Sequence, residues 1–519
     1  MTEIDRRSFL KTGAAATAGG LALGGPFQGV VAAWAAADEG RRPRSGAGYG
    51  PLYPVADLRD GEVRLALPKG FNYRSFNEAG TPLSDGTATP GNHDGMACFD
   101  GSHGNVVLVR NHEINGPIGA FGDPTEAYDA MAPGGTVTLT VTPHGEVLHS
   151  EVSLNGTQMN CSGGEMPWGS WVTCEETVNG PDVGNDFTGQ NNSLLEQKHG
   201  YIFEVPVGGT ASRQPITAAG RFAHEAAAYD PYSKAIYLTE DNFAFPSGFY
   251  KFTPTTDPAV AGQIVNSGTL EMLAVVGEFN ANLSAGQPAG ATYSVTWVPI
   301  ANPDPSFAPG TTNDQAIQAV SGQGLALGAA KFARLEGAVY DAGLVYFVST
   351  QGGAAVNGSV SGYGDGRGQL WAYNPRNETL TLIYESPSKN VLDLPDNITA
   401  SPSGTLVLCE DGSDGNFVRG VTRDGNIFDF AQNLMLDARG NVGGDEFAGS
   451  TFTGNGHTLF VNQQTVRGIS FAIWGLDLAN QRLHMLYESP STQILDFPDN
   501  VTTSPRGTLV VCEDGGDRN

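Results

Sequence analysis

The chain has 519 residues, with 55 Asp and Glu against 28 Lys and Arg, and a formal net charge of −27 at pH 7. So acidic a composition argues against nucleic-acid binding, which needs a basic face. The 70 glycines and 31 prolines, together with few long stretches of helical periodicity, favour an all-β chain with many turns. The acidity has two explanations: it keeps the protein soluble, or the carboxylates gather to bind cations.

The first predicted element, residues 1–37, has the layout of an export signal. Arg6-Arg7-Ser8-Phe9-Leu10-Lys11 precedes a weakly apolar run, which ends in Ala35-Ala36-Ala37. The run is too rich in glycine for a membrane span, which needs roughly 20 strongly apolar residues. The hexapeptide resembles the twin-arginine signal, so we expect the twin-arginine machinery to export the folded chain. Its destination is the periplasm, the cell wall or the medium, and we expect no membrane span in the mature chain.

A strand pattern then recurs six times. A turn with Gly or Pro leads into four to six apolar residues and then into polar or acidic ones: GNVVLVRNHE (104–113), PWGSWVTCEE (167–176), SKAIYLTEDN (233–242), AGLVYFVSTQ (342–351), SGTLVLCEDG (403–412) and NGHTLFVNQQ (455–464). Repeats of about 40–50 residues built from short strands predict a β-propeller. The longer spacing here indicates inserted loops, and six instances indicate six blades.

The acidic ends of these strands suggest a common site. The innermost strand of each propeller blade lines the central channel. If the recurring runs are innermost strands, their acids converge on the axis: Glu113, Glu175, Glu176, Glu240, Asp241, Glu410 and Asp411. Carboxylates crowded together repel one another unless cations lie between them. The alternative is that these acids are solvated strand ends scattered around the rim.

Two segments depart from the repeat. Residues 255–330 are irregular, and we interpret them as an insertion in a propeller domain of residues 38–475. The sequence of residues 384–416 recurs, slightly changed, over residues 487–519. We therefore expect residues 476–519 to be a C-terminal extension that cannot occupy the place of the original, and we assign none of its acids to the site.

Several side chains suit metal or phosphate chemistry. Cys161 is followed by Ser-Gly-Gly, which predicts a polar, flexible segment with a thiolate available to a ligand or metal. Cys174, Cys409 and Cys512 instead end apolar strands, where small buried hydrophobes are expected. The five cysteines show neither the density nor the paired spacing of a disulfide framework.

Three short motifs add carboxylates. GRFAHEAAAYDP (220–231) places His224 beside Glu225. RLEG (334–337) places Arg334 and Glu336 on one face of a strand, as a salt bridge or, beside a metal, as a phosphate clamp and a ligand. LDLPDN (392–397) offers oxygen ligands suited to calcium in Asp393, Asp396 and Asn397.

Over residues 45–475 the chain resembles the PhoX-type alkaline phosphatases. The resemblance rests on the signal, RNHE, NCSGGEMPWGSWVTCEE, GRFAHEAAAYDP, YLTED, RLEG, LPDN and TLFVNQQTVRGISFAIWG. It implies an exported β-propeller that carries iron, Fe(III), and calcium, Ca²⁺, and hydrolyses small phosphate monoesters. The chain departs from the family by continuing past FAIWG (471–475).

The resemblance also implies roles. Cys161 is similar to the thiolate ligand of iron, Arg334 to the residue that grips the phosphate, and Glu336 to a catalytic carboxylate on the cluster. Further metal ligands are implied or suggested by convergence: Glu175 or Glu176, Glu225, Glu240, Asp241, Glu410 and Asp411. Such cations would polarise the phosphoryl oxygens and supply a metal-bound oxygen nucleophile, so no serine or aspartyl nucleophile is needed.

Two other functions remain open. One is a non-catalytic exported propeller, stabilised by calcium, that binds a partner. The other is a lactonase-like propeller hydrolase that needs no iron. Cys161 and the Arg334–Glu336 pair favour the phosphatase, because a purely structural calcium site needs neither a thiolate nor an arginine. We expect a monomer.

Overall fold

The structure, a computed structural model, describes residues 48–209, 211–356, 361–402, 404–412, 415–423 and 425–475, with the backbone of residues 498–503 and 509–513. The predicted signal of residues 1–37 and the side chains of the extension lie outside this part. As the composition predicted, the described chain is almost entirely β. Its helices and 3-10 turns are short: α3 (Asn313–Ile317), α4 (Ser321–Ala326), η2 (Ser102–Gly104), η3 (Pro124–Glu126) and η4 (Thr217–Ala219).

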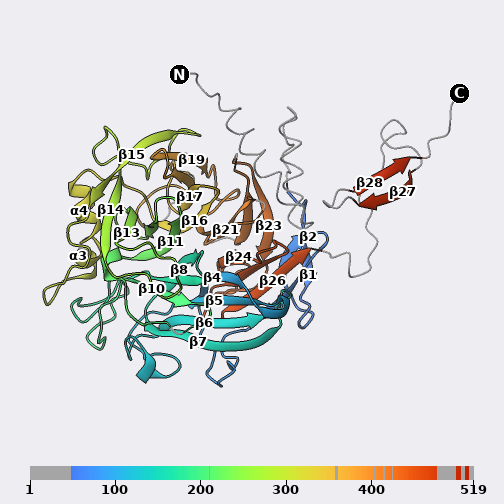
Figure 1. The fold of residues 1–519 in the computed structure, drawn as a ribbon, viewed down its shortest axis with the longest axis horizontal. Coiled ribbons are helices and arrows are strands. Elements are labelled where there is room, and N and C mark those ends of the chain that lie inside the picture. Colours follow the sequence, from blue (N-terminus) through green and yellow to red (C-terminus); the bar gives the residue numbers. More distant parts are fainter. Residues whose placement is uncertain are drawn as a thin grey trace.

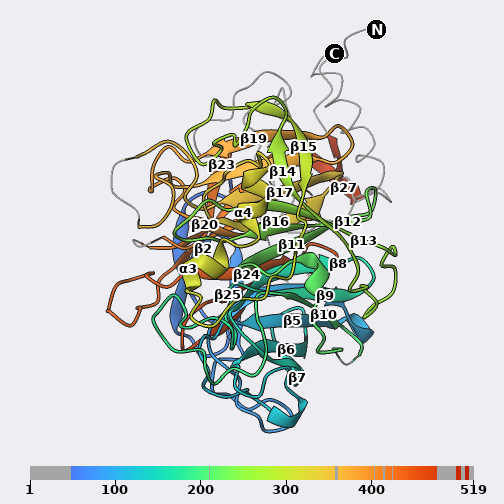
Figure 2. The same ribbon diagram turned by 90° about the vertical axis from the view of Figure 1, so that its left-hand side faces the viewer.

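Six inner strands form the centre of the described chain. They are β4 (His93–Asp100), β8 (Asn160–Met166), β11 (His224–Asp230), β16 (Leu335–Asp341), β20 (Pro395–Ala400) and β24 (Phe447–Phe452). Each contacts the next, and β24 contacts β4, so the ring closes. Each begins an antiparallel blade, as blade I shows in Figure 1 by stepping outward from β4 to β7. In the 90° view of Figure 2, the outer strands β5, β6 and β7 again follow one another in this order. The prediction of a β-propeller is confirmed.

The outer strands complete the blades as follows. Blade I adds β5 (Val106–His112), β6 (Gly134–Val141) and β7 (Val147–Thr157); blade II adds β9 (Ser170–Glu175) and β10 (Ile202–Pro206). Blade III adds β12 (Ala235–Glu240), β13 (Phe249–Pro254) and β14 (Gly268–Val275); blade IV adds β17 (Leu344–Ser349), β18 (Gln369–Asn374) and β19 (Thr379–Glu385). Strand β15 (Thr292–Pro299) pairs with both β14 and β19 and joins blades III and IV. The segment 255–330, predicted to be irregular, thus contains β14, β15 and both helices.

The N-terminal strands complete the last two blades. Blade V adds β21 (Leu406–Glu410), β22 (Phe417–Val421) and β23 (Ile427–Asn433), and is extended by β2 (Val63–Pro68) and β1 (Leu52–Ala56). Blade VI adds β25 (Thr458–Gln463) and β26 (Ile469–Gly475), and its fourth strand is β3 (Phe71–Phe76), which pairs antiparallel with β26. The ring is therefore closed by the N-terminal segment, and the described propeller is complete at residue 475.

The recurring apolar runs are second strands, namely β5, β9, β12, β17, β21 and β25, so the prediction that they are innermost was wrong by one strand. The inner strands lack long apolar runs because neighbouring strands approach closely at the axis. A Cβ atom on Gly95 would lie 2.6 Å from Cα of Ser162, and one on Gly337 would lie 2.7 Å from the backbone nitrogen of Ile398. Small residues are required there, and small residues give no clear sequence signal for a strand.

The core lies between the blades. Phe249 of blade III stacks on Phe347 of blade IV, with ring centroids 4.3 Å apart. Leu108 of β5 packs with Phe460 and Ala472 of blade VI. Because both faces of each blade are covered, the second strands read as nearly continuous apolar runs rather than as alternating ones.

Candidate metal centre

One register position recurs on every inner strand, at its second residue. It holds Asp94, Cys161, Glu225, Glu336, Asp396 and, in blade VI, Ala448. In blades I to V, the residue before it pairs with the end of the second strand, for example His224 with Glu240, and the register shifts directly afterwards. Such a bulge takes a side chain out of the regular ladder. Five potential ligands thus enter one end of the ring from five strands.

A second set comes from the residues that follow the second strands. Because paired strands are antiparallel, the end of β5, β9, β12 or β21 meets the start of its inner strand. The residues at these ends are Glu113, Glu176, Asp241 and Asp411. Gln464 follows β25 in the same way, and its amide donates to Asp94 and, over 2.7 Å, to Oε2 of Glu113.

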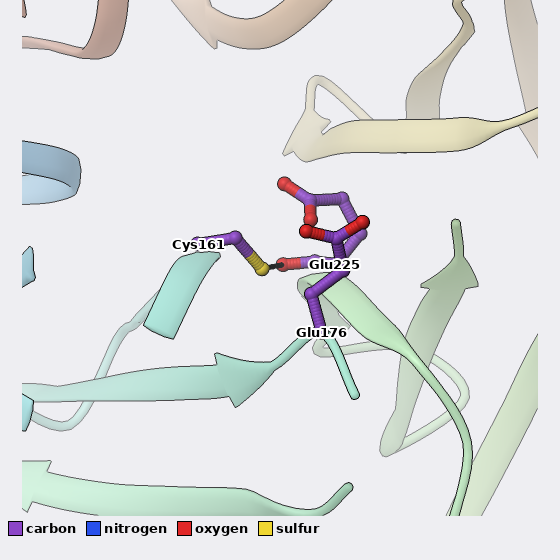
Figure 3. A group of neighbouring side chains, drawn as sticks. All are labelled: Cys161, Glu176 and Glu225. Atoms are coloured by element: carbon purple, nitrogen blue, oxygen red, sulfur yellow. Dashed lines mark hydrogen bonds between the residues drawn. The ribbon is translucent and has the colours of Figure 1, made fainter. Parts of the chain in front are cut away.

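Two groups of side chains lie close enough to hold a cation. Cys161, Glu176 and Glu225 form one, and Glu225, Glu336 and Asp396 form the other; in each, one ligand atom per residue lies within 4.8 Å of the others. Figure 3 shows Cys161, Glu176 and Glu225 approaching one another from separate elements. Glu225 belongs to both groups, so the two positions adjoin.

Cys161 lies in a strand and not in the flexible segment that Ser-Gly-Gly predicted. It is the second residue of β8 and is 4 % exposed. Its Sγ lies 3.2 Å from the carbonyl oxygen of His224. Burial, and then the charges of Glu225 and Glu176, raise the pKa of this thiol well above its ordinary value. Ionisation of the thiol therefore requires a compensating positive charge.

Burial, together with mutual repulsion, also raises the pKa values of the surrounding carboxylates. The pKa of Glu113 rises to about 7 and that of Asp396 to about 6. Those raised well above the ordinary value belong to Asp94, Glu176, Glu225, Glu336 and Glu446. Oε2 of Glu225 is buried without a hydrogen-bond donor in the described chain. Buried acids of this kind are stable as carboxylates only when cations accompany them.

Arg334 provides positive charge at the edge of the cluster. Its Nη2 lies 2.8 Å from Oε1 of Glu336 and 2.7 Å from Oδ2 of Asp241. Its side chain is 15 % exposed, while those of the two acids are almost fully buried. The structure thus joins Arg334 and Glu336, as RLEG predicted, and adds Asp241 as a third partner.

Three predicted ligands point elsewhere. Glu175 accepts hydrogen bonds from His199, Gly200 and Tyr201. Glu240 accepts from the backbone of Gly248 and the hydroxyl of Tyr250, and Glu410 from Arg419, Asp393 and Phe417. Adjacent strand residues face opposite sides, so in each acidic pair one member serves its own blade and the other, Glu176, Asp241 or Asp411, reaches the cluster.

The other predicted oxygen ligands divide in the same way. Asp396 joins the second group, whereas Asp393 pairs with Arg367 at 3.0 Å. Asn397 accepts from the backbone of Ser450 and donates to Ser162, so it ties inner strands together. His224 stacks on Phe222, with ring centroids 3.6 Å apart, and burial lowers its pKa to about 3. The neutral His224 ring is part of the packing.

Sequence reasoning missed Asp94 and Glu446. Asp94 lies in NHDGM, before a glycine that the crowded axis requires, as Glu336 lies before Gly337. Glu446 precedes β24. Burial, and then the charges of Asp411 and Asp396, raise its pKa well above the ordinary value. The available signal for Asp94 was an acid followed by a small residue at the start of an inner strand; Glu446, which is followed by Phe447, lacked this signal.

The described cysteines, Cys98, Cys161, Cys174 and Cys409, are free and buried; Cys512 lies outside the described side chains. No helix of the described chain is long and apolar enough to cross a membrane.

Comparison with known proteins identifies the class. A family model described as alkaline phosphatase PhoX matches residues 47–466, and one for the twin-arginine translocation signal matches residues 3–23. The fold and the match make this chain a β-propeller phosphatase. It belongs to the alkaline phosphatase PhoX family, which is metal-dependent, and it carries a signal for twin-arginine export. The predicted family and the predicted export signal are both confirmed.

One solved structure supports the fold, and two others match with lower similarity. Pseudomonas fluorescens PhoX, in complex with vanadate as a transition state analogue, matches with a TM-score of 0.57 at 17% identity, over 82% of this chain and 97% of that one. A protein of unknown function from Dyadobacter fermentans matches at 0.43 and 9% identity, over 79% and 100%. Virginiamycin B lyase from Staphylococcus aureus matches at 0.35 and 11% identity, over 78% and 100%. No curated protein matches the chain.

Proposed function

We propose that the exported protein hydrolyses phosphate monoesters outside the cytoplasm, with iron and calcium ions held by the thiolate and carboxylates at the end of the ring. The observation that carries the proposal is the adjacency of three features: two potential cation positions that share Glu225, and the guanidinium of Arg334 beside Glu336. A stabilising calcium site alone does not account for a buried thiol and an arginine in the same cluster.

The donor atoms fit such ions. Thiolate is a soft ligand that suits iron, so Cys161, Glu176 and Glu225 are the candidate iron ligands. Carboxylate oxygens suit calcium, and Glu225, Glu336 and Asp396 supply them. The donor-free Oε2 of Glu225 supports this assignment, because a buried carboxylate oxygen without a partner is costly.

Each of the chain's own residues has a definable task. The carboxylates and the thiolate hold the cations, which when bound supply the positive charge that attracts and polarises a phosphoryl group. Arg334 binds the phosphate of the substrate: Nε and Nη2 are occupied by carboxylates, and Nη1 has no carboxylate partner in the described chain. Guanidinium groups bind phosphate oxygens well because their N–H donors form a planar fork.

Two further observations support the proposal. The related Pseudomonas fluorescens PhoX binds vanadate, a transition state analogue, which agrees with a site built for phosphoryl transfer. The twin-arginine signal supports action outside the cytoplasm, since the twin-arginine route exports folded proteins from the cytoplasm. The final compartment and a monomeric state remain parts of the proposal.

The test uses mature protein purified after export without chelator. Its metals are measured by elemental analysis, and hydrolysis of p-nitrophenyl phosphate is assayed at alkaline pH with calcium, before and after chelation. Iron with calcium, and turnover that chelation abolishes, is the expected result. Calcium alone without turnover would favour a binding propeller, and hydrolysis of a lactone instead of the phosphate ester would favour a lactonase.

A further inference from the structure

The guanidinium of Arg334 is held on its edge and on its face by one short segment, residues 241–243. Asp241 accepts from Nε at 3.2 and 3.1 Å and from Nη2 at 2.7 Å, with both carboxylate oxygens engaged. The ring of Phe243 lies against the guanidinium, with its centroid 5.4 Å from Cζ. We call Asp241 and Phe243 the arginine clamp.

The clamp is itself anchored. Asp241 follows β12 directly, and its backbone nitrogen donates to the carbonyl of Ala223 over 3.1 Å. The carbonyl of Phe243 accepts from the backbone nitrogen of Tyr363 over 2.7 Å. Arg334, which directly precedes β16, has φ of 47°, a left-handed conformation uncommon in a residue with a side chain. An unusual backbone and two fixed partners thus define one direction for this long side chain.

Asp241 reaches the cluster but belongs to neither group of side chains that can hold a cation. The two groups that can hold a cation consist of Cys161, Glu176, Glu225, Glu336 and Asp396. Both oxygens of Asp241 already accept from Arg334 in a chelating geometry. The carboxylate of Asp241 therefore acts as a hydrogen-bond partner of the Arg334 guanidinium.

We propose that Asp241 is the positioning residue of Arg334, assisted by Phe243, and is not a metal ligand. The inference rests on the proposed function, because it assumes that Arg334 binds the phosphate of the substrate. An arginine side chain has many rotamers, and ordering them before the substrate arrives removes an entropic cost from binding. Half of the Phe243 surface is exposed, so the ring also forms the rim of the site beside Arg334.

The first experiment compares Asp241→Asn with a matched control. Asp182→Asn removes a carboxylate from a fully buried arginine, Arg221, which Asp182 holds at 2.7 and 2.8 Å outside the cluster. Inorganic phosphate is titrated into each protein by calorimetry, and the metals are measured on the same samples. We expect Asp241→Asn to keep the full metal content and to weaken phosphate binding roughly 10- to 100-fold. Asp182→Asn should lower the melting temperature and leave phosphate binding unchanged.

The second experiment tests whether Asp241 acts through Arg334. Asp241→Asn is added to Arg334→Ala, and we expect no further loss of phosphate affinity, since the guanidinium that it positions is already absent. Phe243→Leu preserves the carboxylate and should weaken phosphate binding only a few-fold. This variant also reports on the clamp if Asp241→Asn fails to fold.

Three results would overturn the inference. The first is loss of metal from Asp241→Asn, and the second is unchanged phosphate affinity in both Asp241→Asn and Phe243→Leu. The third is that adding Asp241→Asn to Arg334→Ala lowers phosphate affinity as much as Asp241→Asn does alone. The proposed function fails separately, if the wild-type protein does not hydrolyse p-nitrophenyl phosphate. Phosphate titration and metal analysis do not depend on turnover, so the two failures are distinguishable.

Discussion

At the strand ends of this propeller, two adjacent acidic residues have different roles. Glu175 is fully buried and accepts from His199 and three backbone amides, whereas Glu176 joins Cys161 and Glu225. The same division separates Glu240 from Asp241 and Glu410 from Asp411. Since side chains alternate along a strand, one acid secures the blade and the next reaches the site.

The division predicts opposite phenotypes for two isosteric substitutions. Glu175→Gln removes the charge from a buried pair with His199, so we expect a loss of about 3–5 kcal/mol in the free energy of unfolding. Glu176→Gln should lose bound metal and turnover with little effect on the fold of the metal-free protein. Denaturant unfolding of chelated protein and elemental analysis of the purified protein measure the two effects; equal metal content in both variants would contradict the account.

His199 predicts a pH dependence of stability. Burial lowers its pKa, but the charge of Glu175 and hydrogen bonding to Asp129 and Glu175 outweigh burial and raise the pKa to about 9. A pKa raised by folding stabilises the protein fully below the unfolded value of 6.5, and this contribution is lost as the pH rises through about 9.

We therefore expect the wild-type protein to lose unfolding free energy, relative to His199→Gln, between pH 6.5 and 9. Denaturant titrations of both proteins across this range measure the difference. Parallel stability curves would mean that His199 does not carry the proton in the folded state.

Sequence reasoning worked for residues that stood in a motif. Cys161, Glu225 and Glu336 were singled out by their neighbours, and the structure brings all three into the cluster. Asp94 and Glu446 were missed, because each is an isolated acid in the sequence and reaches the cluster only when the ring closes. Which member of an acidic pair reaches the axis depends on the face of the strand, and the sequence leaves that choice open.

At the level of elements, hairpin register is encoded locally. Strands β27 (Pro498–Thr503) and β28 (Leu509–Glu513) repeat the sequence of β20 and β21 and form a separate two-stranded sheet, apart from the propeller in Figure 1. Both hairpins pair their first residue with the closing glutamate, and both shift register directly afterwards. The bulge that presents Asp396 is thus a property of the hairpin sequence as well as of the ring.

The closing role of β3 predicts unequal effects of truncation at the two ends. A chain that ends at residue 475 retains every propeller strand, so we expect unchanged turnover and melting temperature. A chain that begins at residue 78 lacks β1 to β3, leaves β26 unpaired on one side, and should not fold. Circular dichroism with thermal melting, and the p-nitrophenyl phosphate assay, compare the two. Loss of activity in the first chain would assign a function to residues 476–519.

For the whole molecule, the periodicity of the sequence was sufficient for the fold class, and the order of strands within a blade was not. The apolar runs are the second strands, because packing between blades requires hydrophobic side chains there. The inner strands carry small and polar residues, because neighbouring strands lie too close together for larger side chains. Of the acids expected at the axis, Glu113, Glu176, Asp241 and Asp411 nevertheless lie at one end of the ring, because the end of a second strand adjoins the start of its inner strand.

The central claim is that two adjoining cation positions share Glu225, and elemental analysis of Glu225→Gln tests it most directly. The variant is purified after export without chelator beside the wild type and beside Glu240→Gln, a buried glutamate hydrogen-bonded within its own blade. The account predicts that Glu225→Gln loses both iron and calcium, whereas Glu240→Gln keeps them. A Glu225→Gln protein with the full complement of both metals would contradict it.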